Sequence, residues 1–255
     1  MMLGARTGAW AKSGYTAKDY VQDGLIAMWD GIENAGLGMH DPNATTWKDL
    51  IGSWGDLEFV GSPAVRDDEI LFNSIGGAQS SNAKTRPSSV TYEIVCNVMS
   101  GYLSVLWAGT GGPHNYGDIV PFGNNSNEAE LYIGGESIKA NASDYPVFDY
   151  GKRCSMTFTL GEGFLRSFKN GSIAQEYAGN RNKAKFNSLR VGMYINGYYQ
   201  PISVCRIGVY ERNLHPIEIA ANYAIDKARF GLTYNHLTLA KTHIVFKNEV
   251  RQRCV

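Results

Sequence analysis

VCRIGVYERNLHPIEIAANYAIDKARFG, residues 204–231, changes its hydrophobic period halfway along its length. The first part alternates as a β-strand does, and the second part repeats as an α-helix does. Pro216 suits the first turn of a helix, where its missing N–H removes no hydrogen bond, and His215 occupies the N-cap position. Gly231 fits the C-cap. The stretch therefore predicts a strand followed by one short helix.

The predicted helix has a small-residue face and a polar face. We expect the small-residue face to pack closely on a sheet and the polar face to meet water. A structural role, covering a sheet edge or a gap in the core, is favoured over a functional one. The small-residue face comprises Ile217, Ala220, Ala221, Ala224, Ile225 and Ala228, and the polar face comprises Glu218, Asn222, Asp226 and Lys227.

Short strand patterns separated by turns fill the rest of the chain. The sharpest is FLRSFKNGSIAQEY, residues 164–177, in which Asn170 and Gly171 tolerate the positive φ angles of a type I′ turn and predict a two-residue hairpin. Many short strands with almost no helix indicate antiparallel pairing, because parallel strands need long crossovers. The sequence predicts an all-β fold, a two-sheet antiparallel β-sandwich with one short C-terminal packing helix.

Length and composition limit the domain count and the partners. The 255 residues include 29 glycines and carry 24 basic and 24 acidic side chains. We expect one domain over residues 20–232, an N-terminal extension over 1–19, and a C-terminal extension over 233–255 with a possible added strand and tail. The balanced charge argues against nucleic-acid binding. No stretch predicts a signal peptide or membrane insertion.

The four cysteines are predicted to be free rather than paired. Cys96, Cys154 and Cys205 each alternate with apolar residues, so each is expected on the apolar face of its own strand. Low cysteine density and the missing signal peptide favour buried thiols over a disulfide framework. Cys254, near the end of the sequence, is the one expected to be exposed.

Several motifs in order resemble the concanavalin A-like, laminin-G-like jelly roll. They are DGLIAMWDG, WKDLIGS, the hairpin at FKNGSIA and the final strand and helix, and together they cover residues 20–232. The final motif stands as Val204, Arg206, Ile207, Tyr210, Arg212, Leu214, Glu218 and Ile219. Ile51 stands where the family has serine, and the loop GIENAGLGMHDPNATT is longer than usual. That long loop resembles uncharacterised versions from gut Bacteroides-type bacteria and their phages.

Two loops have the composition of a sugar-binding site. Sugars present apolar C–H patches beside hydroxyls, so aromatic rings next to amide, carboxylate or imidazole groups suit them. A third, weaker cluster joins Trp54 with Asp56. The alternative is that such residues simply populate β-turns. The first loop offers His114, Asn115, Tyr116 and Asp118, and the second offers Asn196, Tyr198, Tyr199 and Gln200.

Calcium is the one cofactor that the resemblance suggests. Laminin-G-like domains often bind it through loop carboxylates, amides and backbone carbonyls. The candidate ligands are Asp41, Asn43, Asp49 and Asp56. Turn capping by the same side chains is the favoured alternative.

Catalysis is not expected. The jelly roll hosts glycoside hydrolases, which need paired carboxylates, but the best pair, Glu128 and Glu130, is followed on its strand face by Tyr132. No nucleophile or zinc motif is present in the sequence. The predicted function is a non-catalytic carbohydrate-binding or adhesion module, binding a glycan or host-surface polysaccharide.

The biological setting of that module has two alternatives. The first is a phage structural or host-attachment protein, a fibre or capsid decoration, located in the virion, with other virion proteins or further copies of itself as partners. The second is a glycan-binding protein of a gut bacterium, either cytoplasmic or exported to the surface by a non-classical route. A glycoside hydrolase is the least favoured reading.

Overall fold

The structure is a computed structural model that describes the chain in separate stretches. For the described residues between 103 and 140, and for residues 177–178, it describes the backbone alone. The described residues are 14–73, 76–80, 87–99, 103–109, 117–123, 129–133, 136–140, 151–161, 163–178, 189–193, 199 and 201–232.

The first sheet contains the long central strands of the protein. Its order is β14–β13–β12–β7–β16–β5–β4, and β1 pairs with β16 beyond the end of β5. The strands are β1 (Leu25–Asp30), β4 (Ala64–Val65), β5 (Ile70–Phe72), β7 (Val90–Val98), β12 (Arg153–Gly161), β13 (Phe164–Lys169), β14 (Ser172–Ala178) and β16 (Ile202–Tyr210).

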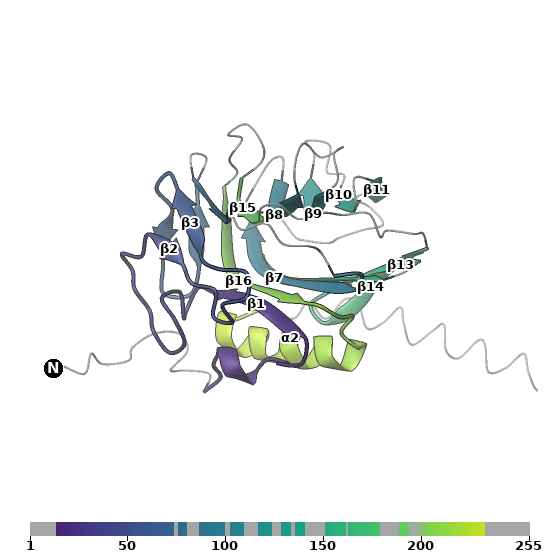
Figure 1. Ribbon diagram of the computed structural model, residues 1–255, viewed down its shortest axis with the longest axis horizontal. Coiled ribbons are helices and arrows are strands. Elements are labelled where there is room, and N and C mark those ends of the chain that lie inside the picture. The colour runs from purple at the N-terminus through teal and green to yellow at the C-terminus, as the bar shows by residue number, and fades with distance from the viewer. Residues whose placement is uncertain are drawn as a thin grey trace, which may run out of the picture.

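The second sheet lies over the first (Figure 1). Its order is β11–β10–β9–β8–β15–β6–β3–β2. Every pairing between described strands is antiparallel, so the predicted two-sheet antiparallel β-sandwich is confirmed. The strands are β2 (Thr46–Trp47), β3 (Leu57–Val60), β6 (Gly77–Ser80), β8 (Leu103–Gly109), β9 (Gly117–Gly123), β10 (Ala129–Ile133), β11 (Glu136–Ala140) and β15 (Leu189–Val191).

The main hydrophobic core lies between the two sheets. Large side chains such as Trp29, Trp47, Phe72 and Phe158 are fully buried there. Each such burial contributes about 1.5–3 kcal/mol. Cys96 and Cys154 lie in this core as predicted, directly opposite each other on β7 and β12.

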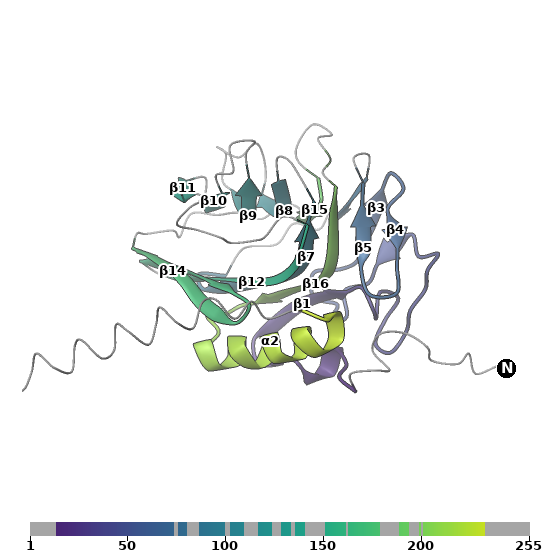
Figure 2. The same ribbon diagram turned by 180° about the vertical axis from the view of Figure 1, so that it is seen from behind.

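The helix predicted near the C-terminal end is confirmed as α2 (Pro216–Phe230). The His215 side chain accepts a hydrogen bond from the Ile217 N–H, and the Glu218 carboxylate accepts one from the His215 N–H at 2.8 Å, which forms a capping box. Gly231 ends the helix at a φ of 66°. The helix runs along the outer face of the first sheet, beneath β12, β7 and β16 (Figures 1 and 2).

The predicted orientation of this helix is wrong for most of its residues, although Ile225 is buried and Lys227 is exposed as predicted. Ile217 is 73% exposed, and the alanines that share its face also meet solvent. The physical reason is that the sheet beneath the helix presents Arg206 and Glu93, so a polar helix face matches it better than an apolar one. The buried side chains of the helix are Ile219, Asn222, Tyr223, Ile225, Asp226, Arg229 and Phe230.

A β-bulge in β16 also departs from the expected alternation. The register with β7 shifts between Val204 and Arg206, which places Cys205 on the helix side of the sheet with Val95 and Tyr223. Ile207 stays on the core side. Cys205 is therefore buried and free, but on the face opposite to the predicted one.

Two local elements complete the helix side of the sandwich. Asn170 and Gly171 have φ angles of 50° and 75°, which confirms the predicted hairpin turn between β13 and β14. Residues of the predicted N-terminal extension form the 3₁₀ helix η1 (Ala17–Asp19), in which Ala17 is buried against the fold. The predicted extension 233–255, including Cys254, lies outside the described residues.

Candidate functional site

The two predicted sugar-binding loops fall almost entirely outside the described residues. Asp118 is placed in β9 by its backbone, and Tyr199 is half-buried and forms an isolated bridge with Met193. The remaining candidates, which lie outside the described residues, are His114, Asn115, Tyr116, Asn196, Tyr198 and Gln200.

Strand register nevertheless locates the points where these two loops leave the second sheet. The first loop follows Gly109 at the C-terminal end of β8. β15 runs antiparallel to β8, with Leu189 opposite Ala108 and Val191 opposite Leu106. The chain therefore leaves β15 in the direction of the N-terminal end of β8. The chain thus runs in opposite directions where it leaves β8 and β15.

Trp54 is not available to stack on a sugar. Its side chain is only 7% exposed, and its ring meets that of Trp29 edge to face with centroids 6.4 Å apart. The third predicted cluster is therefore corrected: Trp54 is a core residue. Its partner Asp56 forms an ion pair with Lys48 instead.

Asp49 is a turn-organising residue rather than an open cation ligand. Its Oδ1 accepts hydrogen bonds from the N–H groups of Met28 and Ile51, both at 3.1 Å. Its Oδ2 accepts them from Trp54 at 2.8 Å and Gly55 at 3.0 Å. The side chain is buried, and four backbone donors surround it. This arrangement explains why the turn needs an aspartate.

The other predicted calcium ligands also cap turns. The Asp41 carboxylate accepts the Asn43 N–H at 2.8 Å, and the Asn34 side chain bridges the N–H and carbonyl of Asp41. Asp56 accepts the Asp49 N–H at 3.1 Å. Within the described ranges, no group of three or more histidine, cysteine, aspartate or glutamate side chains could hold a metal ion. The Asp49 carboxylate, whose two oxygens face four N–H donors, does not fit a cation.

A cluster of buried charges lies between α2 and the first sheet. We call it the ionic cluster: Tyr20, Asp30, Glu33, Glu93, Arg206, Asn222, Asp226 and Arg229. Arg206 Nε donates to Asp226 Oδ1 at 2.8 Å, and its Nη2 donates to Glu93 Oε2 at 3.0 Å. Arg229 donates to Asp30 Oδ2 at 2.7 Å.

Hydrogen bonds from neutral groups complete the ionic cluster. The Tyr20 hydroxyl donates to Asp226 at 2.8 Å, and Asn222 Nδ2 donates to Glu93 at 3.0 Å. The Arg206 guanidinium also lies over the Tyr20 ring, 4.1 Å from its centroid. The cluster joins β1, β7, β16 and the segment before β1 to the helix.

Burial and charge act in opposite directions within the cluster. Burial raises the pKa of Glu93, and the Asp226 carboxylate raises it further, against the lowering effect of Arg206. Burial alone lowers the pKa of Arg206, but the Asp226 and Glu93 carboxylates raise it well above its usual value. Arg206 therefore stays charged inside the protein.

The ionic cluster anchors the helix and does not form an active site. Both arginines and all four carboxylates are at most 3% exposed, so no substrate reaches them. Sequence reasoning missed the cluster because Asn222 and Asp226 were assigned to the solvent face of the helix. A usable signal was present: Glu93 and Arg206 are charged residues of opposite sign in two otherwise apolar strands.

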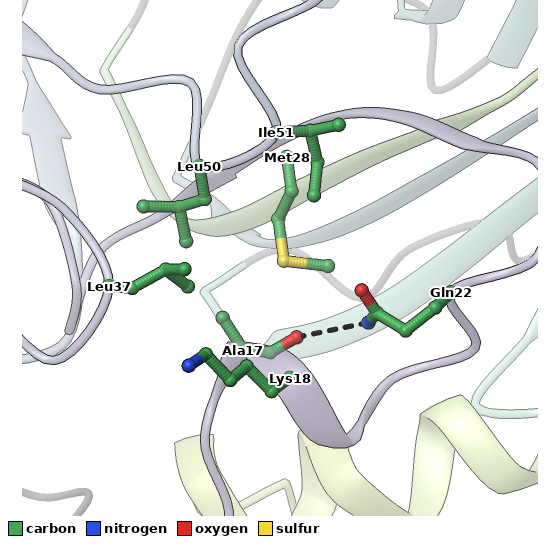
Figure 3. A pocket seen from close by; sticks show the side chains of 7 residues that line it. All are labelled: Ala17, Lys18, Gln22, Met28, Leu37, Leu50 and Ile51. Atoms are coloured by element: carbon green, nitrogen blue, oxygen red, sulfur yellow. Dashed lines mark hydrogen bonds between the residues drawn. The ribbon is translucent and has the colours of Figure 1, made fainter.

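A surface pocket of about 350 Å³ lies beside η1 (Figure 3). Its walls are mainly aliphatic, with Met28 at the sheet and Leu50 and Ile51 from the turn after β2. The Gln22 side chain donates from Nε2 to the Tyr20 carbonyl at 2.8 Å and to the Ala17 carbonyl at 3.5 Å. The complete lining is Ala17, Lys18, Gln22, Met28, Leu37, Leu50 and Ile51.

In the part of the chain that the structure describes, no helix is both long enough and apolar enough to cross a membrane.

Comparison with known proteins establishes the fold class only. No protein family model matches the sequence, and no curated protein matches it. Solved structures do match. Trypanosoma rangeli sialidase superposes with a TM-score of 0.58 at 14% identity, covering 80% of this chain and 33% of that one. The chain thus spans about a third of the sialidase chains that it resembles.

Two other structural neighbours are domains of larger proteins, one from an arabinanase and one from a neurotoxin. Domain 4 of AbnA, a GH43 extracellular arabinanase from Geobacillus stearothermophilus, in complex with arabinotriose, has a TM-score of 0.57 at 12% identity. The match covers 78% of this chain and 98% of that domain. The receptor-binding domain of botulinum neurotoxin C/D mosaic serotype has a TM-score of 0.57 at 12% identity, covering 80% and 52%.

Proposed function

We propose that this protein is a non-catalytic glycan-binding module. The observation that carries the proposal is the match to arabinanase domain 4, because this sandwich covers 98% of a domain whose structure was determined with a bound trisaccharide. Sandwich domains of this kind present loops at both ends of their sheets, where ligand-contacting side chains gather. The likeness to a receptor-binding domain agrees with a role in attachment.

We place glycan binding in two separate loops. The loop at 110–116 contributes His114 and Tyr116, and the loop at 194–198 contributes Asn196 and Tyr198. Each pairs an aromatic ring with polar groups, the combination that a pyranose ring and its hydroxyls require. The chain runs in opposite directions where it leaves β8 and β15, which supports treating each loop as an independent site.

The non-catalytic part of the proposal rests on the placement of carboxylates. Glu130, the best candidate for a hydrolytic residue, lies in β10 directly opposite Lys139 of β11. The carboxylates of the ionic cluster are sealed beneath α2. Glycoside hydrolysis needs two carboxylates open to substrate, and the buried carboxylates of the ionic cluster do not meet that requirement.

The biological setting that we propose is host attachment by a phage particle, with a bacterial surface protein as the alternative. A particle protein meets other virion proteins and further copies of itself through segments outside the sandwich. Mass spectrometry of purified virions tests this setting. Detection of the chain there supports the phage role, and its detection only in bacterial envelope fractions contradicts it.

A glycan array followed by titration calorimetry tests the proposed function. We expect binding to at least one plant or bacterial polysaccharide fragment, with arabinotriose included in the panel. Tyr116→Ala and Tyr198→Ala should each remove one site. Ile173→Ala, at a side chain that is 58% exposed on β14, is the matched control and should bind normally. Binding that survives the double tyrosine variant contradicts the assignment of the loops.

A further inference from the structure

The pocket beside η1 is an open apolar surface outside both proposed glycan loops. Leu37 and Ile51 line it and are 43% and 37% exposed, and Met39, 57% exposed, lies in the same tight turn as Leu37. Single exposed hydrophobic residues are ordinary, but a group of them around one pocket marks a binding surface. Its volume is near the lower end of the roughly 300–1,000 Å³ of ligand pockets.

The chemistry of the lining suits an apolar side chain rather than a sugar. None of the lining residues is aromatic, so no ring is offered for a sugar to stack on. Met28, Leu37, Leu50 and Ile51 provide aliphatic walls (Figure 3). Gln22 donates through its Nε2, which leaves its Oε1 as an acceptor at the edge of the pocket. An indole has matching features, namely a large apolar ring and one N–H donor.

The chain itself supplies such a group close by. Residues 1–13 lie outside the described structure and lead into Gly14, three positions before the pocket residue Ala17. Trp10 is the largest apolar side chain of that segment. The residues from Trp10 to Ala17 can span at most about 25 Å, so Trp10 is tethered near the pocket. A short tether gives an effective concentration on the order of millimolar, which favours this occupant over a dilute second chain.

We propose that the pocket is the docking site of the chain's own N-terminal segment, with the Trp10 indole as the group that fills it. The indole covers Leu37 and Ile51, and its N–H donates to Gln22 Oε1. Docking of this kind joins residues 1–13 to the long loop before β2, which contributes Leu37 to the pocket. The proposal does not depend on glycan binding.

Tryptophan fluorescence of the full-length chain tests the proposal. Subtracting the spectrum of Trp10→Phe from that of the wild type isolates the Trp10 emission. We expect that emission to be blue-shifted and protected from acrylamide relative to N-acetyl-tryptophanamide, at all protein concentrations. Leu37→Asp should return it to the free value, and Ile173→Asp, at an exposed isoleucine elsewhere, should not.

Three outcomes overturn the proposal. The first is Trp10 emission that matches the free indole in the wild-type protein. The second is Trp10 emission that is unchanged by Leu37→Asp, or by Leu37→Ser if the aspartate variant fails to fold by circular dichroism. The third is a blue shift that appears only as concentration rises, together with a doubled mass in light scattering, because a second copy is then the occupant.

Discussion

Replacing Asp226 by asparagine tests whether buried ion pairs attach the helix to the sandwich. Asp226 accepts hydrogen bonds from Tyr20, from Ser155 and from both Nε and Nη2 of Arg206. Asparagine keeps one acceptor oxygen but replaces the other by an NH₂ group, which cannot accept a hydrogen bond from the donors that face it. Arg206 also loses one of its two carboxylate partners. Removing one member of a buried pair costs about 3–5 kcal/mol, because the remaining charge stays desolvated. That loss is a large share of the roughly 5–15 kcal/mol by which a protein is stable.

Urea unfolding followed by circular dichroism is the assay. We expect Asp226→Asn to lower the urea concentration at the unfolding midpoint strongly. The slope of the unfolding free energy against urea concentration should change little, since the surface exposed on unfolding stays the same. The matched control is Glu176→Gln, which breaks the solvent-exposed pair of Glu176 and Arg166 at 2.7 Å and should change stability little, because water screens that pair. Equal, small effects of the two substitutions would refute the reasoning, since they would mean that the cluster is not desolvated.

Three further predictions follow from the described contacts. Gly171→Ala should destabilise the fold by about 1 kcal/mol or more, because φ is 75° and a Cβ would lie 2.8 Å from the Tyr223 ring; normal thermal stability would contradict this. Glu218→Gln should lower the free energy of unfolding by about 1 kcal/mol at neutral pH, because it removes the charge that pairs with Arg212. Hydrogen bonding to Arg212 lowers the pKa of Glu218 from 4.5 to about 2, so this stabilisation is present above pH 4.5 and lost as pH falls toward 2. A difference in stability between wild type and variant that persists at pH 2 would oppose it. EDTA should leave the melting temperature unchanged, because backbone donors surround the Asp49 carboxylate, and a drop that calcium restores would reverse this conclusion.

Local signals were sufficient to predict the fold and the boundaries of the helix. His215, Pro216 and Gly231 set the ends of α2 through hydrogen bonds and backbone angles that depend on neighbouring residues only. Asn170 and Gly171 set the hairpin turn in the same way. Such features depend on local chemistry, so they can be recognised before any tertiary contact is known.

Tertiary contacts decided the features that the sequence predicted wrongly. Amphipathicity places the alanine-rich face of α2 inward only if the surface beneath it is apolar, and Arg206 makes it polar. The bulge that turns Cys205 and Arg206 to the same side of β16 has no glycine to mark it at that position. Trp54 follows a turn with the composition of a binding loop, yet Asp49 folds that turn so that the ring is buried.

The stoichiometry of glycan binding tests the central functional claim most directly. Titration calorimetry with the best glycan from the array should give two sites per chain in the wild type, one in Tyr116→Ala or Tyr198→Ala, and none in the double variant. We treat the two loops as independent sites, because the chain leaves β8 and β15 in opposite directions, so each single loss should leave the other affinity unchanged. No detectable heat with any glycan of the panel, or unchanged binding by the double variant, would contradict the account.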